Sequence, residues 1–190
     1  MNDLLLHACC GPCSTVAVPA WRVRGVEPVG WFENPNIQPA AELERRRESM
    51  LRYSRAAGLE LVVPEAGEEA PGWEAWRAGL SGASPDERCA VCLGLRLDAA
   101  GAAARALGLG RFSTTLTVSP YQRHDLILRA GEAAADAHGV DFVYLDVRDR
   151  FRDSYAECRR LDLYRQPYCG CAASKWEVWR ERQERRRRSA

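Results

Sequence analysis

The 190-residue sequence lacks several features, and each absence excludes a class of protein. No apolar stretch approaches the ~18 residues of a membrane-spanning helix, so we expect no membrane partner. The first residues include Asp3 and lack the basic segment and cleavage site of a secretory signal, which predicts a cytoplasmic protein. Internal repeats and domain linkers are also missing. Residues 1–190 are therefore expected to form a single domain.

Lysine is scarce as well, occurring only at Lys175, and the formal charge of the chain is +1. This balance conceals an uneven distribution, because residues 180–190 (RERQERRRRSA) contain six arginines and two glutamates. Such an arginine-rich tail is either solvated and frayed or in contact with nucleic acid, and the sequence leaves both interpretations open.

Short apolar stretches alternate with helical patterns along the chain. Strands are expected over residues 4–7, 26–32, 59–63, 112–119 and 140–147, and helices over residues 15–24, 40–57, 73–80, 85–107 and 125–138. Ser14 is the expected N-cap of the first helix, and Ser84 with Pro85 and Glu87 forms a capping box before the fourth. The alternation predicts an α/β fold with a doubly wound parallel sheet, followed by C-terminal helices.

Cysteine is abundant: the chain has eight, and seven of them fall into three groups. The groups are Cys9, Cys10 and Cys13; Cys89 and Cys92; and Cys169 and Cys171. In a reducing cytosol such groups indicate metal ligands or redox centres rather than structural disulfides. Cys158 stands alone and is expected to be a packed residue.

Each group can direct its sulfur atoms at one object. Gly11 and Pro12 force a turn that returns Cys13 to the first pair, at the carboxyl end of the first strand. Cys89 and Cys92 lie three residues apart and share a helix face. In extended backbone Cys169 and Cys171 point the same way, with Gly170 leaving room for close approach.

The residues alone leave several chemistries open. Seven thiols can supply four ligands for an iron-sulfur cluster and three for a second metal ion with an open position, and this division fits best. Two zinc sites would need an eighth ligand, for which His7 is a candidate, although a buried strand histidine is more often a packing residue. A dithiol redox enzyme and inert thiols are the remaining alternatives.

Five segments between Leu4 and Cys171 form a distinctive series: LLLHACCGPCS, ENPNIQPAAELERR, ERCAVCLGLRL, STTLTVSPYQ and LYRQPYCGC. Taken together in this order they resemble the QueH-type epoxyqueuosine reductases, which complete queuosine at the wobble position of tRNA. The resemblance implies a Rossmann-like fold similar to the PP-loop and adenine-hydrolase group. It also implies a 4Fe-4S cluster, a neighbouring metal ion (iron or zinc), a tRNA partner and an external electron donor.

The resemblance further implies roles for individual residues. The cluster is assigned to Cys9, Cys10, Cys89 and Cys92, and the second ion to Cys13, Cys169 and Cys171. Tyr168, Asp146 and His7 are candidate proton donors. The candidate substrate contacts are Asn34, Asn36, Thr115, Arg165 and Gln166, although the asparagines could instead be turn residues beside Pro35 and the threonine a strand former.

Three rival functions differ in a testable feature. An ATP-dependent enzyme of the PP-loop type would need a Gly-rich phosphate loop after the first strand, where this chain has HACCGPCS. A zinc-stapled RNA-binding module would contain zinc and no iron or sulfide. A thiol-disulfide oxidoreductase would stay active after chelation.

Overall fold

The computed structural model describes residues 3–64 and 84–188 and contains one parallel five-stranded sheet of order β3-β2-β1-β4-β5. The strands are β1 (Leu4–His7), β2 (Val29–Trp31), β3 (Leu61–Val62), β4 (Arg111–Thr114) and β5 (Asp141–Phe142). The α-helices are α1 (Gly11–Arg22), α2 (Ala40–Ala57), α4 (Pro85–Ala106), α5 (His124–His138), α6 (Asp153–Arg160) and α7 (Ala172–Arg188). Two 3₁₀ turns, Thr115–Val118 and Arg148–Arg150, follow β4 and β5.

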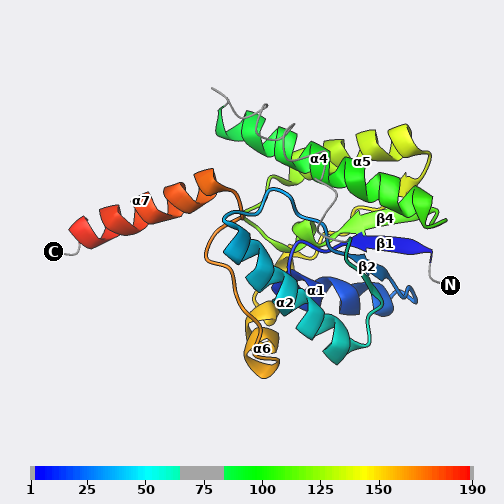
Figure 1. Ribbon diagram of the computed structural model, residues 1–190, viewed down its shortest axis with the longest axis horizontal. Helices are drawn as coiled ribbons and strands as arrows, with labels where there is room; N and C mark the ends of the chain where they lie inside the picture. Colours follow the sequence, from blue (N-terminus) through cyan, green and yellow to red (C-terminus); the bar gives the residue numbers. More distant parts are fainter. Residues whose placement is uncertain (1–2, 65–83, 189–190) are drawn as a thin grey trace.

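Helices cover both faces of the sheet, as Figure 1 shows. Helices α1, α2 and α6 pack together on one face, and α4 packs along α5 on the other. The central strand β1 is buried between these layers, and Leu4, Leu5 and Leu6 are at most 1% exposed. The predicted doubly wound parallel α/β fold with C-terminal helices is confirmed. Its topology brings the carboxyl ends of β1, β2 and β4 to one edge.

Local signals placed several helix ends correctly. The Ser84 hydroxyl accepts from the Glu87 amide at 3.3 Å, and the Glu87 carboxylate accepts from the Ser84 amide at 2.7 Å, which confirms the capping box. Gly58 and Gly139 end α2 and α5 in the left-handed conformation, with φ of 60° and 62°. Absence of a Cβ makes glycine the residue best suited to these caps.

The start of the first helix was predicted wrongly. Helix α1 begins at Gly11 rather than Thr15, and its N-cap is Cys10, whose sulfur accepts from the Cys13 amide at 3.4 Å. Ser14 lies inside the helix and donates its hydroxyl hydrogen to the Cys10 carbonyl at 2.9 Å. A cysteine sulfur thus takes the place that the sequence suggested for a hydroxyl cap.

The strand expected over residues 112–119 was also too long. Strand β4 ends at Thr114, whose Oγ1 accepts from the Leu116 amide at 3.1 Å, and Thr117 donates to the Thr114 carbonyl at 3.1 Å. These bonds between threonine side chains and the backbone support the 3₁₀ turn that replaces the rest of the strand. Strands β2, β3 and β5 are likewise shorter than predicted.

The C-terminal helix α7 projects from the body of the molecule (Figure 1). It includes residues 180–188, so most of the tail expected to be frayed is helical. The helical piece expected around residues 73–80 lies outside the described residues. No helix within residues 3–64 and 84–188 is long and apolar enough to cross a membrane.

Candidate metal centre and substrate cavity

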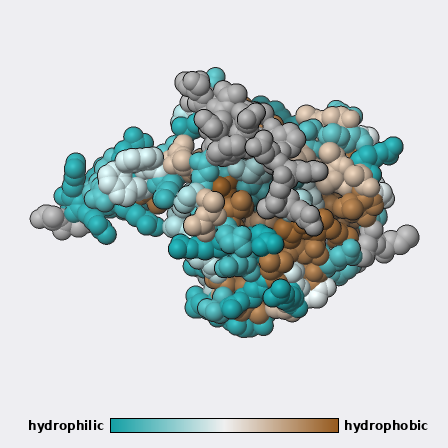
Figure 2. All heavy atoms as spheres, in the orientation of Figure 1, coloured by the Kyte–Doolittle hydropathy of each residue, from teal (hydrophilic) through white to brown (hydrophobic). Residues whose placement is uncertain are grey.

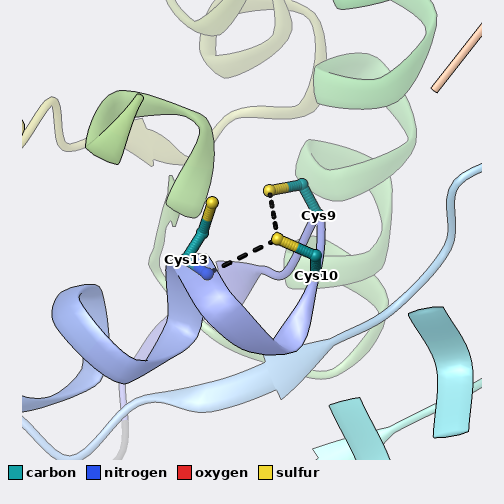
Figure 3. Close-up of side chains that lie close together, drawn as sticks. All are labelled: Cys9, Cys10 and Cys13. Atoms are coloured by element: carbon teal, nitrogen blue, oxygen red, sulfur yellow. Dashed lines mark hydrogen bonds between the residues drawn. The ribbon is translucent and has the colours of Figure 1, made fainter. Parts of the chain in front are cut away.

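The first cysteine group forms a compact cluster at the turn between β1 and α1. The sulfur atoms of Cys9, Cys10 and Cys13 all lie within 4.8 Å of one another, and all three residues are buried. Their side chains point toward one another (Figure 3), and the Cys9 and Cys10 sulfurs are 3.6 Å apart. Three buried thiols at this separation can hold a metal ion.

Two of the expected substrate contacts, Thr115 and Gln166, hydrogen-bond to this cluster. Thr115 accepts from the Cys9 amide at 2.9 Å and donates to the Cys9 sulfur at 3.1 Å. Gln166 donates from its side-chain amide to the Cys10 sulfur at 2.9 Å. Both residues therefore orient thiols in this structure, and the segment before Cys169 is tied to the turn after β1.

The second and third cysteine groups line a common cavity of about 180 Å³. Cys89 and Cys92 come from the first turns of α4, and Cys169 and Cys171 come from the segment that leads into α7. An adjoining cavity of about 520 Å³ is lined by Cys9, Cys13 and Cys169. Arg96, Gln122, Cys169 and Ser174 are among the residues that line both cavities. Thiols from three distant parts of the sequence thus converge at the carboxyl edge of the sheet.

The grouping of sulfur atoms differs in two respects from the assignment made on the sequence. That assignment separates Cys13 from Cys9 and Cys10, whereas the three form one cluster in the structure. Cys89 and Cys92 share their cavity with Cys169 and Cys171 rather than with the first pair. The division of ligands between a cluster and an ion stays a prediction.

The thiols differ in pKa, and therefore in how readily they ionise. Hydrogen bonding with the Cys10 and Cys13 thiols holds the pKa of Cys9 well below its usual range, with help from the positive charge of Arg96. Burial raises the pKa of Cys10, and hydrogen bonding with Cys10 and Cys9 raises that of Cys13. Burial also raises the pKa of Cys92 to about 11. Cys9 is thus the thiol most readily ionised within this triad.

Arg96 lies at the thiol site and was missed by sequence reasoning. It is 3% exposed, lies one helical turn after Cys92 on α4 and lines both thiol cavities. Its Nη2 donates to Oδ1 of Asn34 at 2.6 Å, and Asn34 in turn donates to the Ala8 carbonyl at 2.9 Å. The i, i+4 spacing from Cys92 was the available signal. Burying a guanidinium here places positive charge beside thiols that can become anionic.

Arg46 is a second residue that the sequence did not single out. From α2 its guanidinium donates to the carbonyls of Cys169 at 2.8 Å and Tyr168 at 3.0 Å, and to Oε1 of Glu42 at 2.8 Å. The hydroxyl of Tyr164 completes the group by donating to Oε2 of Glu42 at 2.6 Å. This network attaches the third cysteine group to helix α2. No local pattern reveals it, because its bonds between α2 and the third cysteine group join residues more than 120 positions apart.

The chain is also closely packed at Gly170, between the cysteines of the third group. Gly170 has φ of +149°, and a Cβ there would lie 3.2 Å from the side chains of Asn36 and Ile37. Its carbonyl accepts from the Gln38 amide at 2.9 Å. The backbone conformation therefore favours glycine, and the tight space on this side disfavours a larger residue.

The three candidate proton donors lie in different surroundings. Tyr168 lines the larger thiol cavity, burial raises its pKa, and its hydroxyl donates to the Gln38 carbonyl. His7 is fully buried, its Nδ1 lies 2.8 Å from Oγ1 of Thr114, and burial lowers its pKa to about 3. Asp146 pairs with Arg148 at 2.5 Å and is absent from the residues lining the two thiol cavities.

The remaining candidate substrate contacts also differ. Asn36 lines the smaller thiol cavity, is 2% exposed, and neither polar atom of its amide has a hydrogen-bond partner among the described residues. A buried amide with no partner is available to a ligand. Asn34 is satisfied by Arg96 and Ala8, as above. Arg165 is exposed, lines the larger cavity and stacks over the Tyr155 ring at 3.7 Å.

The fold and the site define a doubly wound α/β protein whose cysteines form a site able to hold metal at the carboxyl edge of the sheet. Within that class the chain belongs to the epoxyqueuosine reductase QueH family, whose model matches residues 4–177. The resemblance found in the sequence motifs is therefore confirmed.

Relatives bearing the name epoxyqueuosine reductase QueH match most of the chain. The protein of Dehalococcoides mccartyi is 37% identical, with 92% of this chain and 93% of the relative covered. Those of Thermotoga maritima and Haemophilus influenzae are 32% and 30% identical, and cover 93% and 95% of this chain with 92% and 75% of their own lengths.

A solved structure is similar in fold alone. It is described as a predicted subunit of tRNA methyltransferase from Methanocaldococcus jannaschii. Its TM-score is 0.55 at 10% identity, covering 83% of this chain and 75% of that one.

Proposed function

We propose that this protein reduces epoxyqueuosine to queuosine in tRNA. The observation that carries the proposal is the convergence of three cysteine groups on adjoining cavities, in a chain of the QueH family. The reaction breaks both carbon-oxygen bonds of a cyclopentane epoxide and forms an alkene. It consumes two electrons and two protons and releases the oxygen as water.

The donor set fits the cofactors that such a reduction needs. Thiolates are the ligands of iron-sulfur clusters, and the first cysteine group is buried and compact. In this proposal Cys9, Cys10, Cys89 and Cys92 hold a 4Fe-4S cluster, while Cys13, Cys169 and Cys171 hold a second metal ion, iron or zinc. Such a pair supplies single electrons from an external donor and a Lewis acid for the epoxide oxygen.

The remaining side chains bind and orient the substrate. The unpartnered amide of Asn36 can donate to and accept from a modified base or ribose in the smaller cavity. Arg165 at the larger cavity offers charge to a phosphate. Tyr168 is the proton donor favoured by position, because it lines the cavity while His7 is held neutral in the core and Asp146 is paired outside it.

Anaerobic reconstitution with iron and sulfide, followed by assay of tRNA carrying epoxyqueuosine, tests the function directly. We expect a brown protein that is bleached by dithionite and converts the nucleoside to queuosine. A protein that takes up zinc alone and produces no queuosine would contradict the proposal and favour a zinc-stapled RNA-binding module. The expected cytoplasmic location stays a prediction.

The ligand division is tested by Cys169→Ala and Cys171→Ala. We expect both variants to lose turnover but keep the visible absorption of the cluster, because neither cysteine is assigned to it. Cys158→Ala is the matched control: this cysteine is 2% exposed, lies on α6 and is absent from the residues lining the two thiol cavities. It should retain both properties. Loss of the chromophore in either test variant would favour a cluster held by the four cysteines that share the smaller cavity.

A further inference from the structure

A third cavity lies outside the thiol site, between the segment after β2 and the first turns of α7. It is an apolar groove of about 850 Å³, and one wall belongs to the motif ENPNIQPAAELERR. The proposed chemistry does not use it. Its walls include Pro35, Ile37, Pro39 and Leu43 on one side and Trp176 and Trp179 on the other. Figure 2 shows α7 as a mostly hydrophilic arm with hydrophobic side chains at its base.

The two tryptophans are unusual for their exposure. Trp176 is 66% exposed and Trp179 is 52% exposed. Their rings pack edge to face, with centroids 4.9 Å apart. They lie three residues apart on a helix that has no buried residue, so they share one face. Large aromatic rings that remain open to solvent on a helix indicate a binding surface rather than a core.

The charge of α7 identifies the kind of partner. The helix carries Lys175 and six arginines against three glutamates, and its last four residues, Arg185–Arg188, are all arginine. A cationic helix is complementary to a polyanion, and exposed indole rings are complementary to flat bases. Aromatic side chains beside basic ones are the typical surface for single-stranded nucleic acid.

The groove adjoins the thiol cavities across the same two segments. Asn36 lines the smaller thiol cavity, whereas its neighbours Pro35 and Ile37 line the groove. On α7, Ser174 and Glu177 line the thiol cavities, whereas Lys175 and Trp176 line the groove. A strand whose target nucleotide enters the thiol cavity therefore has its neighbouring nucleotides at the groove.

We infer that the groove and the tryptophan pair bind unpaired RNA bases next to the modified nucleotide, while the arginines of α7 contact the backbone. This inference rests on the proposed function, because a nucleotide must leave its base stack to reach a reacting centre. The bases on either side of the modified nucleotide lose it as a stacking partner and can stack on the indole rings of Trp176 and Trp179 instead. The site is thus specific for a single-stranded loop rather than for a duplex.

Fluorescence anisotropy with a labelled anticodon stem-loop RNA tests the surface, using full-length reconstituted protein. We expect Trp176→Ala and Trp179→Ala each to raise Kd about tenfold and leave the salt dependence unchanged, because stacking involves no counterion. Trp176→Phe should stay within about threefold of wild type, since the ring is retained. Arg186→Gln with Arg187→Gln should instead reduce the slope of log K against log salt, by about 0.7 for each arginine.

Leu107→Ala is the control, because Leu107 is also exposed, at 49%, but lies after α4 at the amino edge of β4. It should bind as the wild type does. Unchanged Kd in both tryptophan variants would overturn the inference even if the wild type converts epoxyqueuosine normally. The inference would also be overturned if the wild type were a dimer and Trp176→Ala were a monomer with unchanged RNA affinity. In that case a second copy of the chain, and not RNA, would cover the groove. Tryptophan-dependent binding without turnover would uphold the surface and contradict the reductase proposal.

Discussion

Two buried guanidinium groups lie at the thiol site and contact its residues at the level of single side chains. Arg96 and Arg46 are 3% and 2% exposed, and a buried cation is tolerated only where hydrogen bonds replace its hydration. Arg46 meets this need with one carboxylate and two carbonyls, and so fixes the backbone of Cys169. Arg96 is paired with Asn34, and its Nε has no hydrogen-bond partner among the described residues. Arg46 therefore acts by fixing the backbone of the third cysteine group. Arg96 acts by placing its positive charge near the thiols.

Arg46→Lys is expected to lower the free energy of unfolding by about 1–3 kcal/mol. An ammonium group cannot reproduce the planar fork that reaches Glu42 and both carbonyls together, so a buried acceptor loses its donor. Urea unfolding of the metal-free protein measures this change. Arg47→Lys is the control, because Arg47 lies next on the same helix with 45% of its side chain exposed. It should change stability by less than about 0.5 kcal/mol. Equal effects of the two substitutions would contradict a positioning role for Arg46.

Close helix-to-strand packing sets the geometry at the level of elements. Gly131 on α5 faces Phe142 on β5, and a Cβ at Gly131 would lie 2.6 Å from Cγ of that ring. Phe142 in turn packs against Phe112 of β4, with ring centroids 5.1 Å apart. The missing side chain thus lets α5 approach the edge of the sheet.

Gly131→Ala should therefore destabilise the protein by about 1–2 kcal/mol, although alanine favours helix over glycine by about 1 kcal/mol. Gly94→Ala in α4 is the matched control, since no described atom would lie within 4 Å of its Cβ. This control should stabilise the protein by about 0.5–1 kcal/mol. The same urea titration measures both, and a stabilised Gly131→Ala variant would show that the Phe142 ring moves aside without cost.

Local sequence signals predicted helix bounds and caps correctly where interactions between residues close in the sequence determine the conformation. The range of α2 and the capping box of α4 were predicted correctly, because helix periodicity and caps depend on residues a few positions apart. The turn at Thr115–Val118 was missed because threonine favours strands and here bonds to its own backbone. The early start of α1 was missed because a cysteine sulfur acts as its cap.

At the scale of the whole molecule, the topology assembles a site that no single segment contains. Parallel strands place the turn after β1 and the end of β4 at one edge, and α4 and the segment before α7 add the other thiols. The cysteine spacing predicted three groups, and the parallel sheet predicted where the first would lie. Arg46 could not be found this way, since its role depends on contacts with Tyr168 and Cys169, 122 and 123 residues away. The i, i+4 spacing could place Arg96 near Cys92, but its bond to Asn34, 62 residues away, could not be foreseen.

In the proposed site, ligands drawn from three distant segments couple metal binding to the folding of the whole chain. Metal bound by the native state stabilises it by about 2.7 kcal/mol at a free concentration of one hundred times Kd, and the unfolded chain lacks the assembled site. For a chain of this size, that amounts to roughly 5–10 °C in the unfolding midpoint. We therefore expect chelation of the reconstituted protein to lower its midpoint by about this amount in calorimetry, and expect Cys158→Ala to show the same loss. Reconstituted Cys92→Ala should have a lower unfolding midpoint than the wild type. Chelation should lower that midpoint by less, because the second cysteine group then contributes one thiol fewer to metal binding. An unchanged midpoint after complete metal removal from the wild type would mean that the cysteine groups do not share bound metal.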